Sequence, residues 1–338
     1  ITRGFLMALK IAINGFGRIG RCVARIAAVR DDVEIVAIND MASMDMMLYL
    51  LKNDSVHGTF SSDIEQIDDE NISIDGHSIR IFSDRNPKNL KFADYGADMV
   101  LECTGVFLTQ ESAQVHIDNG VEKVLFSAPA KDKETSTFVM GVNEDTYAGQ
   151  KIVSNASCTT NCLGPVAKVL DDAFGIEKGL MTTIHSYTND QRIQDCPHSA
   201  LRRERNGATN WITTSTGAAK EIGIVITALN GKMNGMAVRT PTPTGSLVDL
   251  VVELKKEATV QEVNEAIKKA AEGSMKGVLT YTEDPIVLAD IVMDPASSIF
   301  DAGCTMKVGN MIKIVAWYDN EWGYSNRVCD LIGLMGAM

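Results

Sequence analysis

The chain has 338 residues, with 32 Lys and Arg against 44 Asp and Glu, which gives a net charge of −12. A hydrophobic fraction of 45% and a charged fraction of 22% are typical of globular proteins and exclude a disordered chain, collagen and a small disulfide scaffold. The acidic balance also argues against a nucleic-acid partner, because such binding depends on many Lys and Arg residues that neutralise phosphates.

Neither a membrane segment nor a signal peptide is predicted. The chain contains no apolar run of about 18 residues, the length that a membrane-spanning helix needs. We therefore expect a cytoplasmic protein with no membrane partner. The patterned sequence begins at Met7, and residues 1–6 are expected to be an expression remnant or an extension. The seven cysteines are odd in number and scattered, so they are expected to be free thiols.

Strand-like and helical segments alternate through the first half of the chain. An apolar strand at 9–14 leads through a Gly-rich turn into an amphipathic helix, and a second strand follows at 33–38, which is the pattern of a parallel βαβ unit. The expected segments after it are a helix at 44–52, a hairpin at 72–82 that turns at Asp75-Gly76, a strand at 99–103, a helix that ends near 119–120, and a strand at 123–126. This order predicts an α/β fold with a Rossmann-type doubly wound parallel sheet over residues 7–156.

The second half contains more strands and fewer helices. A helix is predicted at 159–174 and another after the capping-box pattern at 259–262, with strands at 180–186, 236–240, 245–254 and 311–318. This arrangement predicts a second domain, of α+β type, with a mixed or antiparallel sheet over residues 157–321. The final helix, 322–338, is expected to pack back on the first domain.

The Gly-rich turn is the first candidate binding site. Residues 15–20 match G-x-G-x-x-G between a strand and a helix, and Asp40 lies twenty positions after Gly20 at the end of the next strand. Gly15 and Gly17 would let the backbone approach a pyrophosphate at the positive end of the helix. Asp40 would hold the ribose hydroxyls and repel a 2′-phosphate, which favours NAD over NADP. The alternative is a close-packed turn without a ligand.

Cys158 is the candidate nucleophile. It lies where a strand passes into a helix, and the positive end of a helix lowers the pKa of a thiol. His185 ends a predicted strand beside a polar loop and is the candidate base that activates this thiol. The alternatives are an inert buried thiol, a structural histidine, and half a metal site made by Cys158 and Cys162. Because no second Cys/His pair has metal-ligand spacing, no metal site is expected.

Two segments are candidate phosphate sites. Hydroxyl side chains at 213–217 precede a helix, where backbone N–H groups converge, although ordinary N-capping explains the same pattern. Arg239 lies in an otherwise apolar strand, whereas the basic cluster at 202–205 is typical of an exposed face that contributes at most one arginine to a site. Together these features predict that a thiolate attacks an aldehyde, that the adduct gives a hydride to a nicotinamide, and that the thioester passes to water, phosphate or another nucleophile.

The motifs resemble those of the phosphorylating glyceraldehyde-3-phosphate dehydrogenases from about Leu9 to the end of the chain. They are NGFGRIGR at 14–21, SNASCTTNC at 154–162, HSYT at 185–188, TSTGAAK at 214–220, RTPTP at 239–243 and WYDNEWGYS at 317–325. The resemblance implies a homotetramer that converts D-glyceraldehyde 3-phosphate, NAD and inorganic phosphate to 1,3-bisphosphoglycerate in glycolysis. The reaction would pass through a thiohemiacetal and a thioester on the cysteine.

The resemblance also implies a role for individual residues. Cys158 and His185 would be catalytic. The residues implied for the attacking phosphate are Ser157, Thr159, Thr216 and Gly217, and those for the substrate phosphate are Thr188, Arg239 and Arg203. For the cofactor, the resemblance implies Arg18 and Ile19 at the pyrophosphate, Asp40 at the ribose, Arg85 at the adenine, and Ser127 and Asn320 at the nicotinamide.

Three other functions fit parts of this pattern. An erythrose-4-phosphate dehydrogenase would use the same cysteine and NAD but would hydrolyse the thioester. Semialdehyde and acyl-phosphate reductases share the architecture but generally use NADP, which Asp40 disfavours. A binding protein with an inactive site is disfavoured by the intact Cys158, His185 and Arg239.

Overall fold

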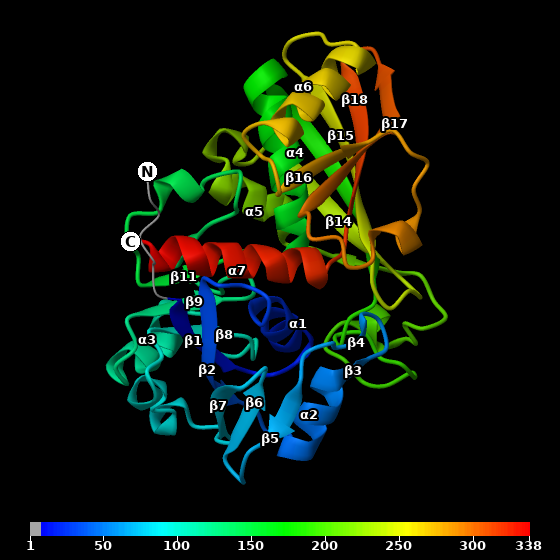
Figure 1. The fold of residues 1–338 in the computed structure, drawn as a ribbon. Helices are drawn as coiled ribbons and strands as arrows, with labels where there is room; N and C mark the ends of the chain where they lie inside the picture. The colour runs from blue at the N-terminus through cyan, green and yellow to red at the C-terminus, as the bar shows by residue number, and fades with distance from the viewer. Residues whose placement is uncertain (1–7) are drawn as a thin grey trace. The chain divides into compact units, whose positions relative to one another are not determined.

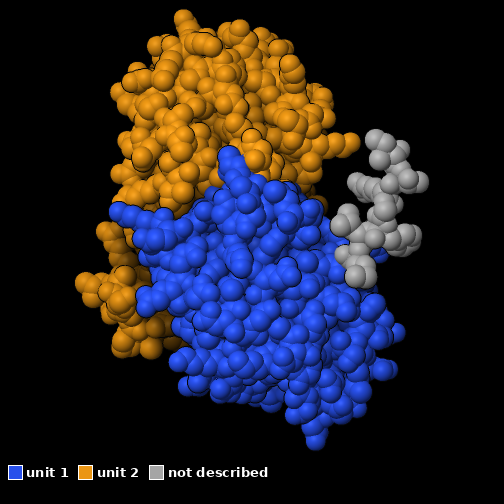
Figure 2. All heavy atoms as spheres, turned by 90° about the vertical axis from the view of Figure 1, so that its left-hand side faces the viewer, with its two compact units in different colours: residues 1–138, 146–156, 325–338 blue, residues 139–145, 157–324 orange. Residues whose placement is uncertain are grey.

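The computed structural model describes residues 8–338, so the prediction for residues 1–6 lies outside the described residues. The described chain divides into two compact units (Figure 2). Unit 1 comprises residues 8–138, 146–156 and 325–338, and unit 2 comprises residues 139–145 and 157–324. None of the described helices is long and apolar enough to cross a membrane.

A mostly parallel sheet forms the centre of unit 1. Its strand order is β10-β11-β9-β8-β1-β2-β7-β6-β5, and the pairs from β10 to β7 are all parallel (Figure 1). The strands are β1 (Leu9–Asn14), β2 (Val33–Asn39), β5 (Ile64–Gln66), β6 (Asn71–Ile74), β7 (His77–Phe82), β8 (Met99–Glu102), β9 (Lys123–Phe126), β10 (Ser136–Thr137) and β11 (Ile152–Ser154); β3 (Asn53–Asp54) and β4 (Gly58–Thr59) pair separately. The predicted doubly wound sheet is confirmed.

The hairpin between β6 and β7 shows why the sequence predicts this part of the sheet. Asp75 and Gly76 both have positive φ angles, 49° and 83°. A two-residue turn of this kind matches the right-handed twist of the flanking strands, and Asp-Gly is a preferred pair for it. The hairpin adds antiparallel strands to the parallel sheet at the β7 edge.

Four helices accompany this sheet: α1 (Arg18–Ala27), α2 (Met44–Lys52), α3 (Gln110–Asp118) and α7 (Trp322–Gly336). Residues 325–338, most of α7, belong to unit 1 although they end the chain. The Asp330 carboxylate lies 2.7 Å from Arg30 Nη1, just after α1, and a Cβ on Gly336 would contact Leu9 at 2.9 Å. The end of the chain therefore packs on residues from its beginning.

Unit 2 contains a mixed sheet with the strand order β13-β14-β12-β15-β18-β17-β16. The pairs β12–β14 and β16–β17 are parallel and the others are antiparallel, as expected for an α+β domain. The strands are β12 (Ile176–Ser186), β13 (Ile212–Ser215), β14 (Met233–Thr240), β15 (Ser246–Leu254), β16 (Leu279–Thr282), β17 (Ser298–Val308) and β18 (Met311–Tyr318); the helices are α4 (Cys158–Phe174), α5 (Ala218–Val225) and α6 (Val260–Glu272). Helix α4 packs against α5, α6 and several of the strands.

Candidate active site

The Gly-rich turn forms an open cradle between β1 and α1. Gly15 has φ +97°, and a Cβ there would lie 2.8 Å from the backbone of Cys103 and Thr104, so only glycine fits without a shift. A Cβ on Gly17, the N-cap of α1, would meet nothing within 4 Å, and no side chain caps this helix. The positive end of α1 therefore faces the turn without a side-chain cap, and the cradle fits the pyrophosphate of a dinucleotide.

Asp40 lies beside this turn, immediately after β2. Its Oδ2 accepts a hydrogen bond from the Phe16 N–H at 2.7 Å, and its Oδ1 accepts one from the Ala42 N–H at 2.9 Å. β1 is hydrogen-bonded to β2 on one side and to β8 on the other. Later strands are therefore added on opposite sides of β1, and the cradle lies at the end of this strand. This switch point is where doubly wound sheets bind nucleotides.

The other residues predicted for the cofactor lie at or near the carboxyl ends of strands. Arg18 opens α1, and its Nη1 lies 2.6 Å from Asp54 Oδ2, while Ile19 follows it, half-buried. Arg85 is exposed three residues after β7, the parallel neighbour of β2. Ser127 follows β9, and its hydroxyl donates to the Glu102 carbonyl at 3.1 Å. Asn320 belongs to unit 2.

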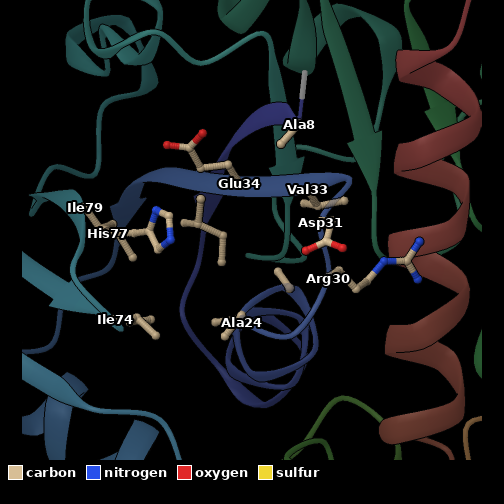
Figure 3. A pocket seen from close by; sticks show the side chains of 12 residues that line it. Ala8, Ala24, Arg30, Asp31, Val33, Glu34, Ile74, His77 and Ile79 are labelled. Carbon is tan, nitrogen blue, oxygen red and sulfur yellow. The ribbon is translucent and has the colours of Figure 1, made fainter. Parts of the chain in front are cut away.

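A cavity of about 260 Å³ in unit 1 lies elsewhere (Figure 3). It is lined by α1, by the β6–β7 hairpin, and by Ala8, Val33 and Glu34 at the amino-terminal ends of β1 and β2. The Arg30 side chain points away from it toward α7. Because dinucleotides bind at the carboxyl ends of the strands, this cavity is not the cofactor site.

Cys158 and His185 lie together in unit 2. Cys158 is the first residue of α4, His185 stands near the end of β12, and Cys158 Sγ is 3.5 Å from His185 Nε2. His185 Nδ1 lies 2.8 Å from the Ser186 carbonyl oxygen and 2.7 Å from Arg239 Nη1. Either neutral tautomer of the imidazole therefore has a partner at Nδ1. With the proton on Nδ1, Nε2 is free to accept the thiol proton.

The prediction that the helix start lowers the pKa of the Cys158 thiol is wrong for a thiol that ionises without passing its proton to His185. Burial raises the pKa of the Cys158 thiol to about 11, although Arg239 opposes this shift. Burial also lowers the pKa of His185 to about 3, and Arg239 adds to that shift. Both pKa shifts arise because burial removes the water that would stabilise a thiolate on Cys158 or an imidazolium on His185. Transfer of one proton from Sγ to Nε2 creates two opposite charges side by side, which burial penalises less than either charge alone.

Arg239 stands directly beside this pair. In the parallel pairing of β12 with β14, His185 is opposite Arg239, and Arg239 Nη1 also donates to the Ser186 carbonyl at 3.1 Å. Tyr318 supports the other side of the site. Its buried hydroxyl lies 2.9 Å from Thr159 Oγ1 and 2.8 Å from Thr183 Oγ1, and its ring meets the His185 ring edge to face.

The residues predicted for the attacking phosphate lie at the starts of two helices. Ser157 caps α4 by accepting from the Thr160 N–H at 3.2 Å, and Thr159 lies in the first turn. Thr216 and Gly217 precede α5, with Gly217 as the N-cap and without a side-chain cap. Helices α4 and α5 pack against each other, and Ser157 at the start of α4 donates a hydrogen bond to Glu221 in the first turn of α5.

The residues predicted for the substrate phosphate have protein partners. Thr188 donates its hydroxyl to Gln191 Oε1 at 3.1 Å. Arg203 donates from Nε to Thr214 Oγ1 at 2.9 Å and forms an ion pair with Asp190. These partners hold the two side chains in place, and an incoming phosphate would compete with them.

Asn320 is buried and contacts Ser186, the last residue of β12. Its Oδ1 accepts hydrogen bonds from Ser186 Oγ at 2.9 Å, Ser246 Oγ at 3.0 Å and the Gly245 N–H at 3.1 Å. This leaves Nδ2 as the amide group that could donate to a ligand.

Sequence reasoning missed two polar residues of this site. Tyr318 falls inside the WYDNEWGYS motif, two residues before Asn320, so its motif was the available signal. Glu221 follows the TSTGAAK motif by one residue, and its carboxylate accepts from Ser157 and Thr160. Its position four residues after Gly217 put it on the first turns of a helix, but no pattern in the sequence connected it with α4.

Comparisons with known proteins agree with the two halves of this description. Residues 9–110 match the family model of the NAD binding domain of glyceraldehyde 3-phosphate dehydrogenase, and residues 157–320 match its C-terminal domain. The chain belongs to the glyceraldehyde-3-phosphate dehydrogenase family. The resemblance seen in the motifs is confirmed, and the chain is an NAD-dependent oxidoreductase of this family.

Bacterial members of the family are similar over nearly the whole chain. A glyceraldehyde-3-phosphate dehydrogenase of Priestia megaterium is 53% identical over 334 residues, which are 98% of this chain and 99% of the relative. The Geobacillus stearothermophilus protein of the same name is 52% identical over 334 residues with the same coverage. That of Mycolicibacterium smegmatis is 51% identical over 338 aligned positions, again covering 98% of this chain and 99% of the relative.

Proposed function

We propose that this protein oxidises D-glyceraldehyde 3-phosphate with NAD and inorganic phosphate to 1,3-bisphosphoglycerate, as in glycolysis. The observation that carries the proposal is Cys158 Sγ at 3.5 Å from His185 Nε2, with Arg239 beside the pair, in a chain of this family. A thiol, a base and a buried cation are what a covalent attack on a phosphorylated aldehyde needs.

Cys158 and His185 carry the covalent steps. The thiol passes its proton to His185 Nε2 as Sγ attacks the aldehyde carbon, and His185 returns the proton to the developing oxyanion to give the thiohemiacetal. When the carbon loses its hydride, His185 takes the hydroxyl proton again and a thioester remains on Cys158. A phosphate oxygen then attacks the carbonyl carbon, and the C–S bond breaks to release the Cys158 thiolate.

Two groups of residues hold the phosphates in this proposal. Arg239, Thr188 and Arg203 bind the phosphate of the aldehyde, with Arg239 closest to the reacting pair. Ser157, Thr159, Thr216 and Gly217 bind the attacking phosphate, where two helix starts offer N–H groups and hydroxyls.

The cofactor is held by residues of the Gly-rich turn and the neighbouring strand ends. Gly15, Gly17, Arg18 and Ile19 bind the pyrophosphate, Asp40 binds the ribose hydroxyls, and Arg85 lies at the adenine. Ser127 and Asn320 orient the nicotinamide. Bound NAD supplies the acceptor for the hydride.

We assign NAD binding to residues 7–156 and catalysis to residues 157–321, with residues 322–338 returning to the first domain. We also infer a cytoplasmic homotetramer, which is supported by the family membership alone. The mass in solution, measured by light scattering, tests the assembly: four times the chain mass is expected, and a monomer would contradict it.

The competing activity is erythrose-4-phosphate dehydrogenase, in which water accepts the acyl group. It gains no support from the relatives described above, which all carry the name glyceraldehyde-3-phosphate dehydrogenase. The two activities differ in their need for phosphate.

Steady-state NADH formation from glyceraldehyde 3-phosphate tests the proposal. The rate is expected to rise with inorganic phosphate or arsenate and to vanish in Cys158→Ser, which should still bind NAD. Cys196→Ser, which changes an exposed cysteine, is the matched control and should keep the activity. A rate that is equal without phosphate, or turnover retained in Cys158→Ser, would refute the assignment.

A further inference from the structure

The carboxylate of Glu221 joins the starts of α4 and α5. Its Oε2 accepts hydrogen bonds from the Ser157 N–H at 3.3 Å, from Ser157 Oγ at 3.0 Å and from the Thr160 hydroxyl. These donors belong to the N-cap and first turn of α4, directly beside Cys158. Glu221 therefore takes up the donors that an anion at this helix start would use.

The second oxygen of Glu221 lies over the start of α5. A Cβ built on Gly217 would stand 3.1 Å from Glu221 Oε1. A carboxylate therefore lies between Ser157 and Gly217, two residues that our proposed function assigns to the attacking phosphate anion.

The charges around Cys158 oppose one another. Burial is the main cause that raises the pKa of the Cys158 thiol; the charge of Glu221 adds to it, and Arg239 opposes it. Both side chains thus act electrostatically on the same sulfur. For a phosphate that approaches the thioester on Cys158, Glu221 is repulsive and Arg239 attractive.

We propose that Glu221 sets the affinity for the attacking phosphate in the acyl-transfer step: its carboxylate anchors Ser157 and Thr160, and its charge weakens the binding of that phosphate. This inference rests on the proposed function. It assigns Glu221 two separable effects, because the hydrogen bonds depend on an acceptor oxygen and the repulsion depends on the charge. Glu221→Gln keeps an acceptor and removes the charge, whereas Glu221→Ala removes both.

Kinetics with varied inorganic phosphate separate the two effects. Glu221→Gln is expected to lower the KM for phosphate about three- to tenfold, equivalent to about 0.7–1.4 kcal/mol, with kcat within about twofold of wild type. Glu221→Ala is expected to lower KM similarly and to lower kcat as well, because Ser157 and Thr160 lose their acceptor. Glu265→Gln, an exposed change on α6, is the matched control and should alter neither constant. An unchanged or higher KM in Glu221→Gln would overturn the charge effect, and equal kcat in both variants would overturn the anchoring.

Alkylation of Cys158 tests the charge without turnover. The rate with anionic iodoacetate, divided by the rate with neutral iodoacetamide at one pH, is expected to rise about threefold in Glu221→Gln and to stay constant in Glu265→Gln. An unchanged ratio in Glu221→Gln would overturn the inference. Failure of the proposed function is distinguishable, since wild-type turnover that is independent of phosphate would refute that function whatever the alkylation ratio shows.

Discussion

Replacing His185 by Asn tests whether the cysteine depends on its neighbour for ionisation. Cys158 Sγ and His185 Nε2 are 3.5 Å apart, and burial, only partly opposed by Arg239, raises the thiol pKa to about 11. In wild type, the proton moves to His185 and the pair reacts as a thiolate. In His185→Asn the thiol has no base, so it should ionise only as the pH approaches its raised pKa.

The size of the effect follows from these values. A thiol with a pKa of about 11 is ionised to about 0.1% at about pH 8, whereas an ordinary thiol with a pKa of about 8.5 is ionised to about a quarter. Alkylation of Cys158 in His185→Asn should therefore be about a hundredfold or more slower than that of an ordinary thiol at this pH, and slower than in wild type, where His185 takes the proton. Its rate should rise about tenfold for each pH unit, because the raised pKa leaves the thiolate as the minor form up to about pH 11.

The assay is the rate of iodoacetamide incorporation at Cys158, located by peptide mass analysis, between about pH 6 and pH 10. His77→Asn changes an exposed histidine of β7 in unit 1 and should react like wild type. In denaturant, the His185→Asn thiol should recover the reactivity of an ordinary cysteine, because burial is removed. Rapid alkylation of folded His185→Asn near pH 7 would show that the helix start ionises the thiol by itself and would refute this reasoning.

Three further predictions concern Gly15, Tyr318 and Asp40. Gly15→Ala should lower the free energy of unfolding by about 2 kcal/mol or more, because the new Cβ would lie 2.8 Å from backbone atoms at a residue with φ +97°. Gly17→Ala, where the Cβ would meet nothing within 4 Å, should leave the melting temperature unchanged. Equal melting curves for the two variants would contradict this prediction. Tyr318→Phe should cost about 1–2 kcal/mol in urea unfolding, since two buried threonine hydroxyls lose a partner, and an unchanged midpoint would count against it. Asp40→Ala should raise the KM for NAD about tenfold and bring the NAD and NADP efficiencies closer, so a preserved ratio would exclude Asp40 from nucleotide selection.

The parts of the fold that the sequence predicts best have strong local signals. β1 and β2 are apolar runs on either side of a Gly-rich turn and helix, and Asp75-Gly76 is a preferred pair for a two-residue hairpin turn. β17 was not predicted, because Asp301 and Gly303 interrupt its apolar pattern and a register shift occurs between Asp301 and Met306. Its pairing with β18 stabilises a segment that has little strand character of its own.

The candidate site shows the same division between local and long-range information. Cys158 and His185 could be named from a helix start and a strand end, but their distance depends on how α4 packs on the sheet. The direction of the shift in the thiol pKa could not be predicted from the sequence. The position of Cys158 at a helix start is a local property, whereas its burial depends on tertiary packing. Glu221 was missed for the same reason, since its partners lie about 60 positions earlier in the chain.

A single-turnover experiment tests whether Cys158 carries the acyl group to phosphate. The protein is mixed with NAD and glyceraldehyde 3-phosphate in buffer free of phosphate, and NADH is followed in time. A burst of about one NADH per Cys158 with little further turnover is expected, followed by sustained turnover once inorganic phosphate is added. Steady turnover without phosphate, or no burst in wild type, would show that Cys158 does not carry the acyl group to phosphate.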